Sequence, residues 1–507
     1  MGKVPKGIIC IKMLTDAIIG TFSTPILLFI VIIGSFLSSR RSLRSMLLLS
    51  MMWDVIFRND IPNLEYIGGL HLFIGLLVLS DTVLDLRSFS KPSLLGLYMC
   101  ALVLAFPVTY TQKTSLYRDA LVILLTSAPY IGIWPLTSSE RYAEVERLIL
   151  DKELPEHLCG ALSKVEGLNT LHVTHKDKAV QNREEHYRET LVLLHGMGGG
   201  NVLWVQSLGV LAKKYDVYCV ELPGMGGSDR PDWSAWDPTQ AIALFQERLE
   251  SWRTAIGLDK FALLGHSLGA MVAAAYAVRF GHHVKALVLV SPVGVAAYDE
   301  FVKPTKGPAA VMLSGSFPAR LACWMWEQHI GPFDVLRAVG PFARSVVTWV
   351  MDKKISRSDG TSYLRQSSDE SRALMNEYLY HNWCLSPSGE RAVTVLLGPG
   401  VCPRLPICTW LRVAGQNARS EFTLHVPCIL GPGISKDCSV SLIYGDENND
   451  WMDKNHGDRL VAQLREDGCH HVYSTRVAGA GHLVNLDQPF TFADSVIQVL
   501  ERKIGKQ

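Results

Sequence analysis

The chain has 507 residues, with 49 Lys and Arg, 48 Asp and Glu, and a formal net charge of +1 at pH 7. Because charge is balanced and no stripe of Lys and Arg occurs, the composition excludes an electrostatic nucleic-acid-binding surface, and no nucleic-acid partner is expected. The eleven cysteines are scattered and form no CxxC pair, which favours reduced thiols over a disulfide framework. No metal-ligand spacing is present either, so neither a metal nor a cofactor is expected.

The first 140 residues differ from the rest in containing three long segments without charge, at residues 17–39, 92–112 and 120–139. Each approaches or exceeds the roughly 20 residues that a helix needs to cross the hydrocarbon core of a bilayer. A fourth, shorter apolar segment lies at residues 66–80. We therefore expect residues 1–140 to form an all-α transmembrane region with three or four spans. An incorrect gene model for this part of the chain is the alternative.

The orientation of these spans is weakly determined, because three lysines precede the first segment and three arginines follow it, so the positive-inside rule nearly cancels. No N-x-[ST] glycosylation acceptor occurs in the chain. This absence favours a cytosolic location for the residues that follow the membrane region.

Two apolar strands followed by glycine-rich turns come next along the chain. The first strand, at residues 190–194, leads into His195-Gly196-Met197-Gly198-Gly199-Gly200, a turn that can point backbone N–H groups at a substrate oxygen. The second, at residues 216–222, leads into residues 223–231. This second turn has neither the G-K-[ST] ending of a P-loop nor the G-x-G-x-x-G spacing, so it predicts a tight strand-to-helix connection rather than a nucleotide site.

Residues 261–275, FALLGHSLGAMVAAA, have the most informative pattern in the chain. A short apolar strand, the sequence Gly-His-Ser-Leu-Gly and a helix of small residues follow one another, as in a G-x-S-x-G nucleophile elbow. Ser267 is therefore the candidate nucleophile, and the N–H groups of Met197 and Leu268 are candidates for an oxyanion hole. A turn that serves only helix packing is the alternative.

A strand at residues 284–290 is followed by about 140 residues before the next one, too long for a structureless loop. We expect a cap domain there. Its aromatic stretch, residues 309–350, is either the core of the cap or a lipid-facing surface or acyl-chain tunnel.

The last strands predict the remaining catalytic groups. Residues 439–444 precede a loop of carboxylates, of which Asp450 is the first candidate for the triad acid and Asp453 the second. His482, between glycines after an alternating segment at residues 472–477, is the candidate base. The order Ser, acid, His matches that of the nucleophile-elbow enzymes.

These motifs together resemble the α/β-hydrolase superfamily. The resemblance rests on LVLLHGMGGG from Leu191, ELPGMGGSDRP from Glu221, GHSLG, DWMD at Asp450 and HLVNLDQP at His482. The segment YLYHNWCLSPSGE from Tyr378 resembles one branch, which contains a lipase coactivator, an N-acylphosphatidylethanolamine lipase, plant lysophosphatidate acyltransferase/lipase proteins and a yeast cardiolipin-specific deacylase. Two features depart from that pattern: the acid loop is about two residues longer, and the cap is extended around residues 397–437.

The resemblance implies an α/β-hydrolase fold with a helical cap. The expected organisation is a membrane region at residues 1–140, a linker at 141–162, core at 163–294 and 437–507, and the cap at 295–436. It further implies a membrane-associated serine hydrolase that cleaves acyl esters of phospholipids or lysophospholipids through an acyl-enzyme on Ser267. Endoplasmic reticulum, mitochondrion and lipid droplet are all compatible locations.

Two other functions remain open. His482 and Asp487 form an H-x4-D pair, which in this branch has been read as a lysophospholipid acyltransferase signature. Asp487 followed by Gln488 and Pro489 also predicts an ordinary helix N-cap, which is the reading we favour. A non-catalytic scaffold that recruits a lipase, for instance at a lipid droplet, is the second alternative. The coactivator member lacks the nucleophilic serine, so the presence of Ser267 argues against this scaffold.

Overall fold

A computed structural model describes residues 137–176, 189–296, 307–339, 342–358, 362–415, 431–447 and 449–502. The segments expected to cross a membrane lie outside these residues, apart from the last few residues of the third. Within the described ranges, no helix combines the length and the hydropathy of a membrane span. The expected domain boundaries remain predictions.

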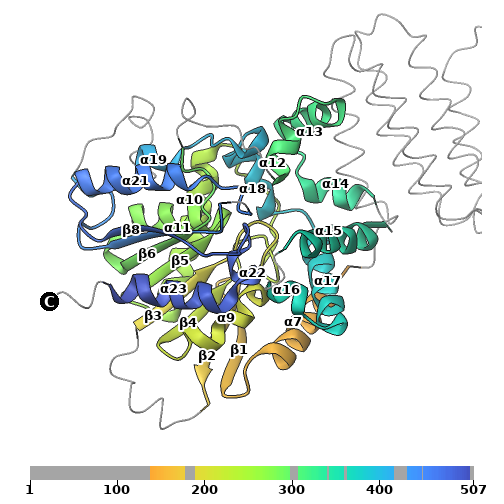
Figure 1. Ribbon diagram of the computed structural model, residues 1–507, viewed down its shortest axis with the longest axis horizontal. Helices are drawn as coiled ribbons and strands as arrows, with labels where there is room; N and C mark the ends of the chain where they lie inside the picture. Colours follow the sequence, from red (N-terminus) through yellow and green to blue (C-terminus); the bar gives the residue numbers. More distant parts are fainter. Residues whose placement is uncertain are drawn as a thin grey trace, which may run out of the picture. The chain divides into compact units, whose positions relative to one another are not determined.

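The core is a mixed sheet of eight strands in the order β1-β2-β4-β3-β5-β6-β7-β8 (Figure 1). Strand β2 pairs antiparallel with β1 and β4, and the neighbours from β4 to β8 pair in parallel. The strands are β1 Leu158–Val165, β2 Leu168–His175, β3 Glu189–Leu194, β4 Tyr215–Val220, β5 Phe261–His266, β6 Val284–Val290, β7 Ser439–Tyr444 and β8 Val472–Arg476.

The central strands are continuous apolar runs because helices cover both faces of the sheet. Every residue of β5 and β7 is buried. The strands predicted at residues 284–290 and 439–444 are confirmed at both ends, and β4 differs from its prediction by one residue at the start and two at the end. The carboxyl ends of β3, β5, β6, β7 and β8 therefore meet at one edge of the sheet, where the candidate site residues follow them.

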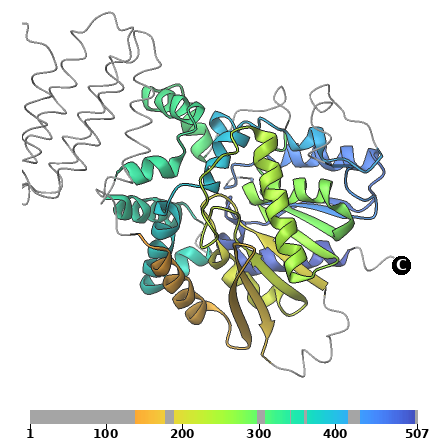
Figure 2. The same ribbon diagram turned by 180° about the vertical axis from the view of Figure 1, so that it is seen from behind.

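Two layers of helices cover the sheet, as both views show (Figures 1 and 2). One face packs against α10 Pro238–Ile256, α11 Leu268–Arg279 and α21 Lys454–Glu466, and the other against α9 Val205–Leu211 and α23 Pro489–Glu501. Helix α10 shows why such segments start and stop where they do. The Asp237 side chain accepts hydrogen bonds from the N–H groups of Thr239 and Gln240, and Gly257 ends the helix with a φ of 80°.

Helices α12 to α19 lie between β6 and β7, where the sequence predicts a cap, and we refer to them as the cap. They are α12 Gly307–Met312, α13 Phe317–Glu327, α14 Pro332–Ala338, α15 Ala343–Arg357, α16 Tyr363–Gln366, α17 Asp369–Cys384, α18 Ala392–Leu396 and α19 Ile407–Trp410. Helix α7, Ser139–Glu153, precedes the sheet and packs against α17. Together α7, α14, α15, α16 and α17 enclose a third hydrophobic cluster beside the sheet.

Candidate active site

Ser267 stands between β5 and α11 in a strained backbone conformation. Its φ of 54° and ψ of −116° are rarely adopted by a residue with a side chain. The turn is possible because its flanking glycines lack Cβ atoms. A Cβ on Gly265 would lie 2.2 Å from the Gly269 carbonyl oxygen, and one on Gly269 would lie 2.4 Å from the His195 carbonyl oxygen. The elbow therefore brings the start of α11 against the end of β3.

The structure brings Ser267, His482 and Asp450 together in one hydrogen-bonded series. His482 Nε2 lies 3.0 Å from Ser267 Oγ, and His482 Nδ1 lies 3.4 Å from Asp450 Oδ1. Ser267 is 9% exposed and Asp450 is 5% exposed. These three side chains come from the loops after β5, β7 and β8, so the parallel sheet accounts for their meeting.

The Asp450 carboxylate is held by groups other than His482 as well. Burial alone would raise its pKa, but hydrogen bonds from His482, the Ser291 hydroxyl and the Met452 N–H together lower that pKa to about 2. Ser291 Oγ donates to Asp450 Oδ2 over 2.6 Å, and the Gly445 N–H donates to the same oxygen over 2.9 Å. The carboxylate is therefore charged at neutral pH. The sequence places Ser291 at the end of β6, but its bond to the acid was not predicted.

Asp453, the second candidate for the acid, lies elsewhere. It is the N-cap of α21, and its side chain accepts a hydrogen bond from the Asn455 N–H over 2.9 Å. Asp450, and not Asp453, lies beside His482, so the geometry favours the first candidate, and the role of triad acid stays a prediction. The position of Asp453 one residue before a helix is the local signal for the capping role.

The two groups expected to form an oxyanion hole lie on adjoining turns. Leu268 is the first residue of α11, and the N–H groups of a first helical turn have no partner within the helix. Met197 belongs to the glycine turn after β3, which approaches the elbow closely. A Cβ on Gly196 would lie 2.9 Å from Ser267 Cβ. Their role as oxyanion donors remains a prediction.

Helix α17 holds this glycine turn from the cap side, which sequence reasoning missed. Asn382 Nδ2 donates to the carbonyl oxygens of Gly198 and Gly199 over 3.1 and 2.7 Å. Trp383 Nε1 donates to the Gly198 oxygen over 2.8 Å. Both residues belong to the branch-specific segment YLYHNWCLSPSGE. The resemblance of this segment to one branch of hydrolases was the sequence feature that could have indicated a role at the site.

The same segment interlocks with the second glycine turn. A Cβ on Gly389 would lie 1.8 Å from the Pro223 carbonyl oxygen, and one on Gly224 would lie 2.1 Å from the Gly389 nitrogen. Ser388 Oγ also donates to the Pro231 oxygen over 2.5 Å. The turn at residues 223–231 is therefore a tight connection beside the site, in agreement with its sequence.

Behind the first glycine turn, a buried carboxylate accepts hydrogen bonds from five donors. Glu221 is bonded by the N–H groups of Asn201 and Gly227, the Asn169 amide, and the hydroxyls of two tyrosines, Tyr142 of α7 and Tyr378 of α17. A second buried carboxyl, Glu146, shares the Asn169 amide. Burial first, and the proximity of Glu221 second, raise the pKa of Glu146 well above its usual value. The protonated form of Glu146 is therefore favoured.

Two residues, His266 and Trp451, contact the main chain and the ring of His482, respectively. His266 Nε2 lies 2.8 Å from the His482 carbonyl oxygen, and the Trp451 ring lies 4.6 Å from the His482 ring. Burial first, and then the nearby His482, lower the pKa of His266 to about 3. His266 is therefore neutral, and its Nε2 can donate to the main chain of His482.

Asp487 does not cap helix α23, contrary to the favoured prediction. The N-cap is Gln488, which makes no capping bond through its side chain, and Asp487 ends the short helix α22, Val484–Asp487. Its carboxylate instead accepts hydrogen bonds from Lys354 Nζ of α15 and from the Gly481 N–H. Tertiary contacts with the cap thus override the local capping signal.

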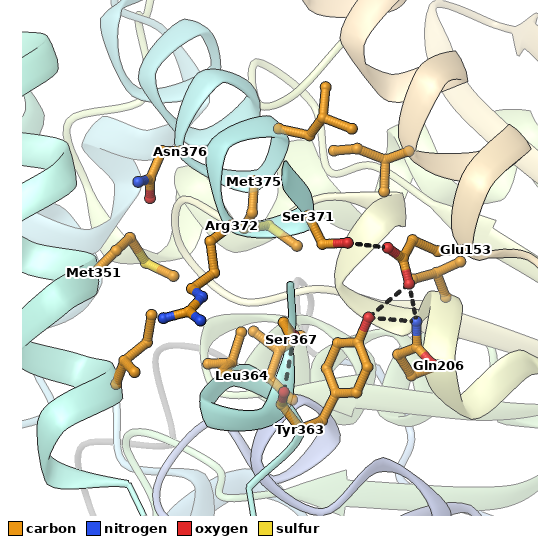
Figure 3. Close-up of a pocket in the computed structure, with 15 residues that line it drawn as sticks. Glu153, Gln206, Met351, Tyr363, Leu364, Ser367, Ser371, Arg372, Met375 and Asn376 are labelled. Atoms are coloured by element: carbon orange, nitrogen blue, oxygen red, sulfur yellow. Dashed lines mark hydrogen bonds between the residues drawn. The ribbon is translucent and has the colours of Figure 1, made fainter. Parts of the chain in front are cut away.

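A pocket lies between cap helices α15, α16 and α17 and helices α7 and α9 (Figure 3). At one end, Tyr363 and Ser371 donate hydrogen bonds to the Glu153 carboxylate over 2.6 and 2.5 Å. The rest of the lining is formed mainly by apolar and Arg side chains, among them Met351, Leu364, Arg372, Met375 and Leu486. The described residues that line it do not include Ser267, His482 or Asp450, so we treat it as a seam between cap and core.

Comparisons with known proteins match the same part of the chain. Residues 189–312 fit the family model described as alpha/beta hydrolase fold. A 1-acylglycerol-3-phosphate O-acyltransferase of Arabidopsis thaliana is 28% identical over 318 residues, which cover 62% of this chain and 68% of that protein. The (lyso)-N-acylphosphatidylethanolamine lipase of Homo sapiens is 28% identical, over 63% of this chain and 81% of the relative. The 1-acylglycerol-3-phosphate O-acyltransferase ABHD5 of Homo sapiens is 31% identical, over 61% and 77%.

Proposed function

This chain belongs to the α/β-hydrolase family, in the branch that contains these acyltransferases and lipases, and on that premise we propose that it is a serine hydrolase of lipid acyl esters. The observation that carries the proposal is the 3.0 Å approach of His482 Nε2 to the hydroxyl of a strained Ser267, with Asp450 on the far side of the imidazole. Nucleophile, base and orienting acid are the three parts of a catalytic triad.

In the proposed reaction, His482 takes the proton of the Ser267 hydroxyl while Oγ attacks the ester carbonyl. The N–H groups of Met197 and Leu268 stabilise the resulting oxyanion, and Asp450 stabilises the imidazolium. His482 then gives its proton to the leaving alkoxide, which departs and leaves an acyl group on Ser267. Water, activated by His482, releases the fatty acid and restores the serine.

We propose phospholipids or lysophospholipids as the substrate class. The support is that relatives are named as a (lyso)-N-acylphosphatidylethanolamine lipase and as acyltransferases of 1-acylglycerol-3-phosphate. The charge-free segments within residues 1–140 support attachment to a membrane. We further propose that the catalytic domain faces the cytosol.

Acyl transfer is the second candidate activity, and the names of two of these relatives favour it. It needs the same acyl-enzyme on Ser267. The acceptor would be the free hydroxyl of a lysophospholipid in place of water, so that His482 deprotonates an alcohol and an ester is formed. Product analysis with and without lysophospholipid acceptor distinguishes the two.

The test is labelling of the purified full chain with a fluorophosphonate probe, compared with Ser267→Ala. The matched control is Ser495→Ala, a serine of α23 whose hydroxyl donates to the Thr491 carbonyl oxygen in the preceding turn. We expect Ser267→Ala to lose labelling and esterase activity and Ser495→Ala to keep both. Labelling of Ser267→Ala at the wild-type level would refute the proposal and favour the scaffold. Lipidomics of wild-type protein with mixed membrane lipids then identifies the substrate.

A further inference from the structure

The buried carboxylate of Asp487 accepts hydrogen bonds from four residues, and neither Ser267 nor the ring of His482 is among them. Asp487 is 1% exposed. Its two oxygens lie 2.9 and 2.6 Å from Lys354 Nζ, and hydroxyls of Ser358 and Ser362 donate to Oδ1 over 3.3 and 3.4 Å. Three of its four partners belong to the cap side of the molecule.

The fourth partner is the main chain of the His482 loop. The Gly481 N–H donates to Asp487 Oδ2 over 2.8 Å. Gly481 directly precedes His482, and a Cβ there would lie 3.0 Å from Asp487 Oδ2 and 3.3 Å from the Asn449 carbonyl oxygen. Asp487 therefore fixes the backbone on one side of His482, while the bond from His266 fixes its carbonyl oxygen on the other.

The positive charge paired with this carboxylate comes from the cap, on Lys354. Lys354 belongs to α15, and its side chain is 25% exposed, whereas that of Asp487 is 2% exposed. Removing one partner of such a pair leaves a charge in a poorly solvated place, which is unfavourable unless the carboxylate moves toward water. Movement of Asp487 would release the Gly481 N–H and with it the direction of the His482 imidazole.

We infer that Asp487 is a positioning residue, which together with Lys354 holds the His482 loop so that reaction at Ser267 depends on α15 being in place. The inference rests on the proposed function of Ser267 as nucleophile. It assigns Asp487 to orientation of the base, in place of an acyltransferase dyad and of a helix cap.

The seam in Figure 3 offers a control on the same cap–core boundary. Tyr363 donates to Glu153 Oε2 there, and Leu486, the neighbour of Asp487, lines the same pocket. Tyr363→Phe removes a cap–core hydrogen bond but leaves Asp487, Lys354 and Gly481 intact. Comparison with Tyr363→Phe therefore separates the effect of a generally loosened cap from the effect of losing the Asp487 contact.

The experiment measures the second-order rate constant of fluorophosphonate labelling at Ser267, together with kcat and KM on a soluble ester, for the full chain. The variants are Asp487→Asn, Lys354→Met, Lys354→Arg and Tyr363→Phe, each checked for folding by thermal unfolding. We expect Asp487→Asn and Lys354→Met to lower labelling and kcat about 10- to 100-fold with KM nearly unchanged, because small misplacement of a base has effects of that size. Lys354→Arg should recover most of the rate, and Tyr363→Phe should label like wild type even if its Tm falls.

Labelling of folded Asp487→Asn and Lys354→Met within about twofold of wild type would overturn the inference, as would an equal slowing by Tyr363→Phe. Selective loss of acyl transfer in Asp487→Asn, with unchanged labelling, would also overturn it, in favour of the dyad. If Asp487→Asn does not fold, the contrast between Lys354→Met and Lys354→Arg decides. Labelling of Ser267→Ala at the wild-type rate would instead refute the proposed function itself.

Discussion

On one side of Ser267, Asp450 and His482 stand on loops that directly follow strands β7 and β8. Most of the contacts to this acid–base side come from the core, through Ser291, Gly445 and His266. On the other side, α17 donates hydrogen bonds to the glycine turn at residues 196–200. Tyr142 of α7 bonds Glu221, which also accepts the N–H of Asn201, the residue after this turn. This oxyanion side therefore has its supports outside the sheet.

The two halves of the site therefore depend on different parts of the molecule for their positions. The acid–base side is assembled by the sheet, and from the cap Lys354, Ser358 and Ser362 contact it through Asp487. The oxyanion side is assembled by helices far away in the sequence. Changes in α17 should therefore weaken stabilisation of the oxyanion while His482 remains bonded to Ser267.

The largest effect is expected on the acid–base side. Asp450→Asn should lower kcat by about 10³- to 10⁴-fold, because the amide cannot hold the imidazole in the reactive tautomer. Asp453→Asn is the matched control and should stay close to wild type, since asparagine caps a helix about as well. Ester hydrolysis by the two variants measures the contrast. An equal loss in both would contradict the position of Asp450 as the triad acid.

The next largest effect is expected on the oxyanion side. Asn382→Ala removes the two bonds to Gly198 and Gly199 and should lower kcat about 10- to 100-fold, less than the complete loss of an oxyanion donor. The control is Asn376→Ala, on the same helix but in the lining of the seam (Figure 3). Steady-state kinetics distinguishes them. If both variants lose the same activity, α17 acts only through the stability of the cap.

The two sides should also respond to pH with opposite signs. The pKa of Asp450 is lowered to about 2, so its contribution to stability is complete above the ordinary value near 3.8 and is lost as pH falls toward 2. The loss should be about 2 kcal/mol. Urea unfolding between pH 2 and 5 should therefore show a flatter pH dependence for Asp450→Asn than for wild type, and identical slopes would disprove this account.

On the oxyanion side, the pKa of Glu146 is raised, so its contribution is complete below the ordinary value of 4.5 and is lost as pH rises through the raised pKa. Glu146→Gln cannot ionise and should be more stable than wild type at pH 8, by on the order of 1 kcal/mol, with no gain near pH 4. Glu221→Gln is the contrasting variant and should be less stable, because five donors face its carboxylate. Denaturant unfolding at both pH values measures the difference, and a destabilised Glu146→Gln at pH 8 would refute it.

Much of the fold follows from local pattern. Strands β6 and β7 match their predicted ranges because continuous apolar runs bounded by turn residues specify buried parallel strands. Ser267 could be located since glycines, strand and helix occur in the order that the elbow requires. The fold class is confirmed as that of an α/β hydrolase, with a mixed sheet and covering helices.

The error about Asp487 and the missed role of α17 both concern hydrogen bonds between residues that are distant in sequence. Asp487 followed by Gln488 and Pro489 resembles a helix start, but Lys354, 133 residues away, binds the carboxylate. The bonds from Asn382 to the glycine turn join residues about 184 positions apart. No local pattern specifies which of many polar side chains will face such a turn. Which of Asp450 and Asp453 lies beside His482 likewise depends on the path of the loop after β7.

Gly224 packs against Gly389, which is made much later during synthesis. The site at Ser267 can therefore be completed only after the cap segment has been synthesised. A growing chain that ends near residue 300 contains the GHSLG motif and six of the eight strands. It lacks α17, whose side chains bond the glycine turn at residues 196–200, and it lacks both Asp450 and His482. A shortened or alternatively spliced product that keeps the motif should therefore be inert, although a search by motif alone would count it as an enzyme.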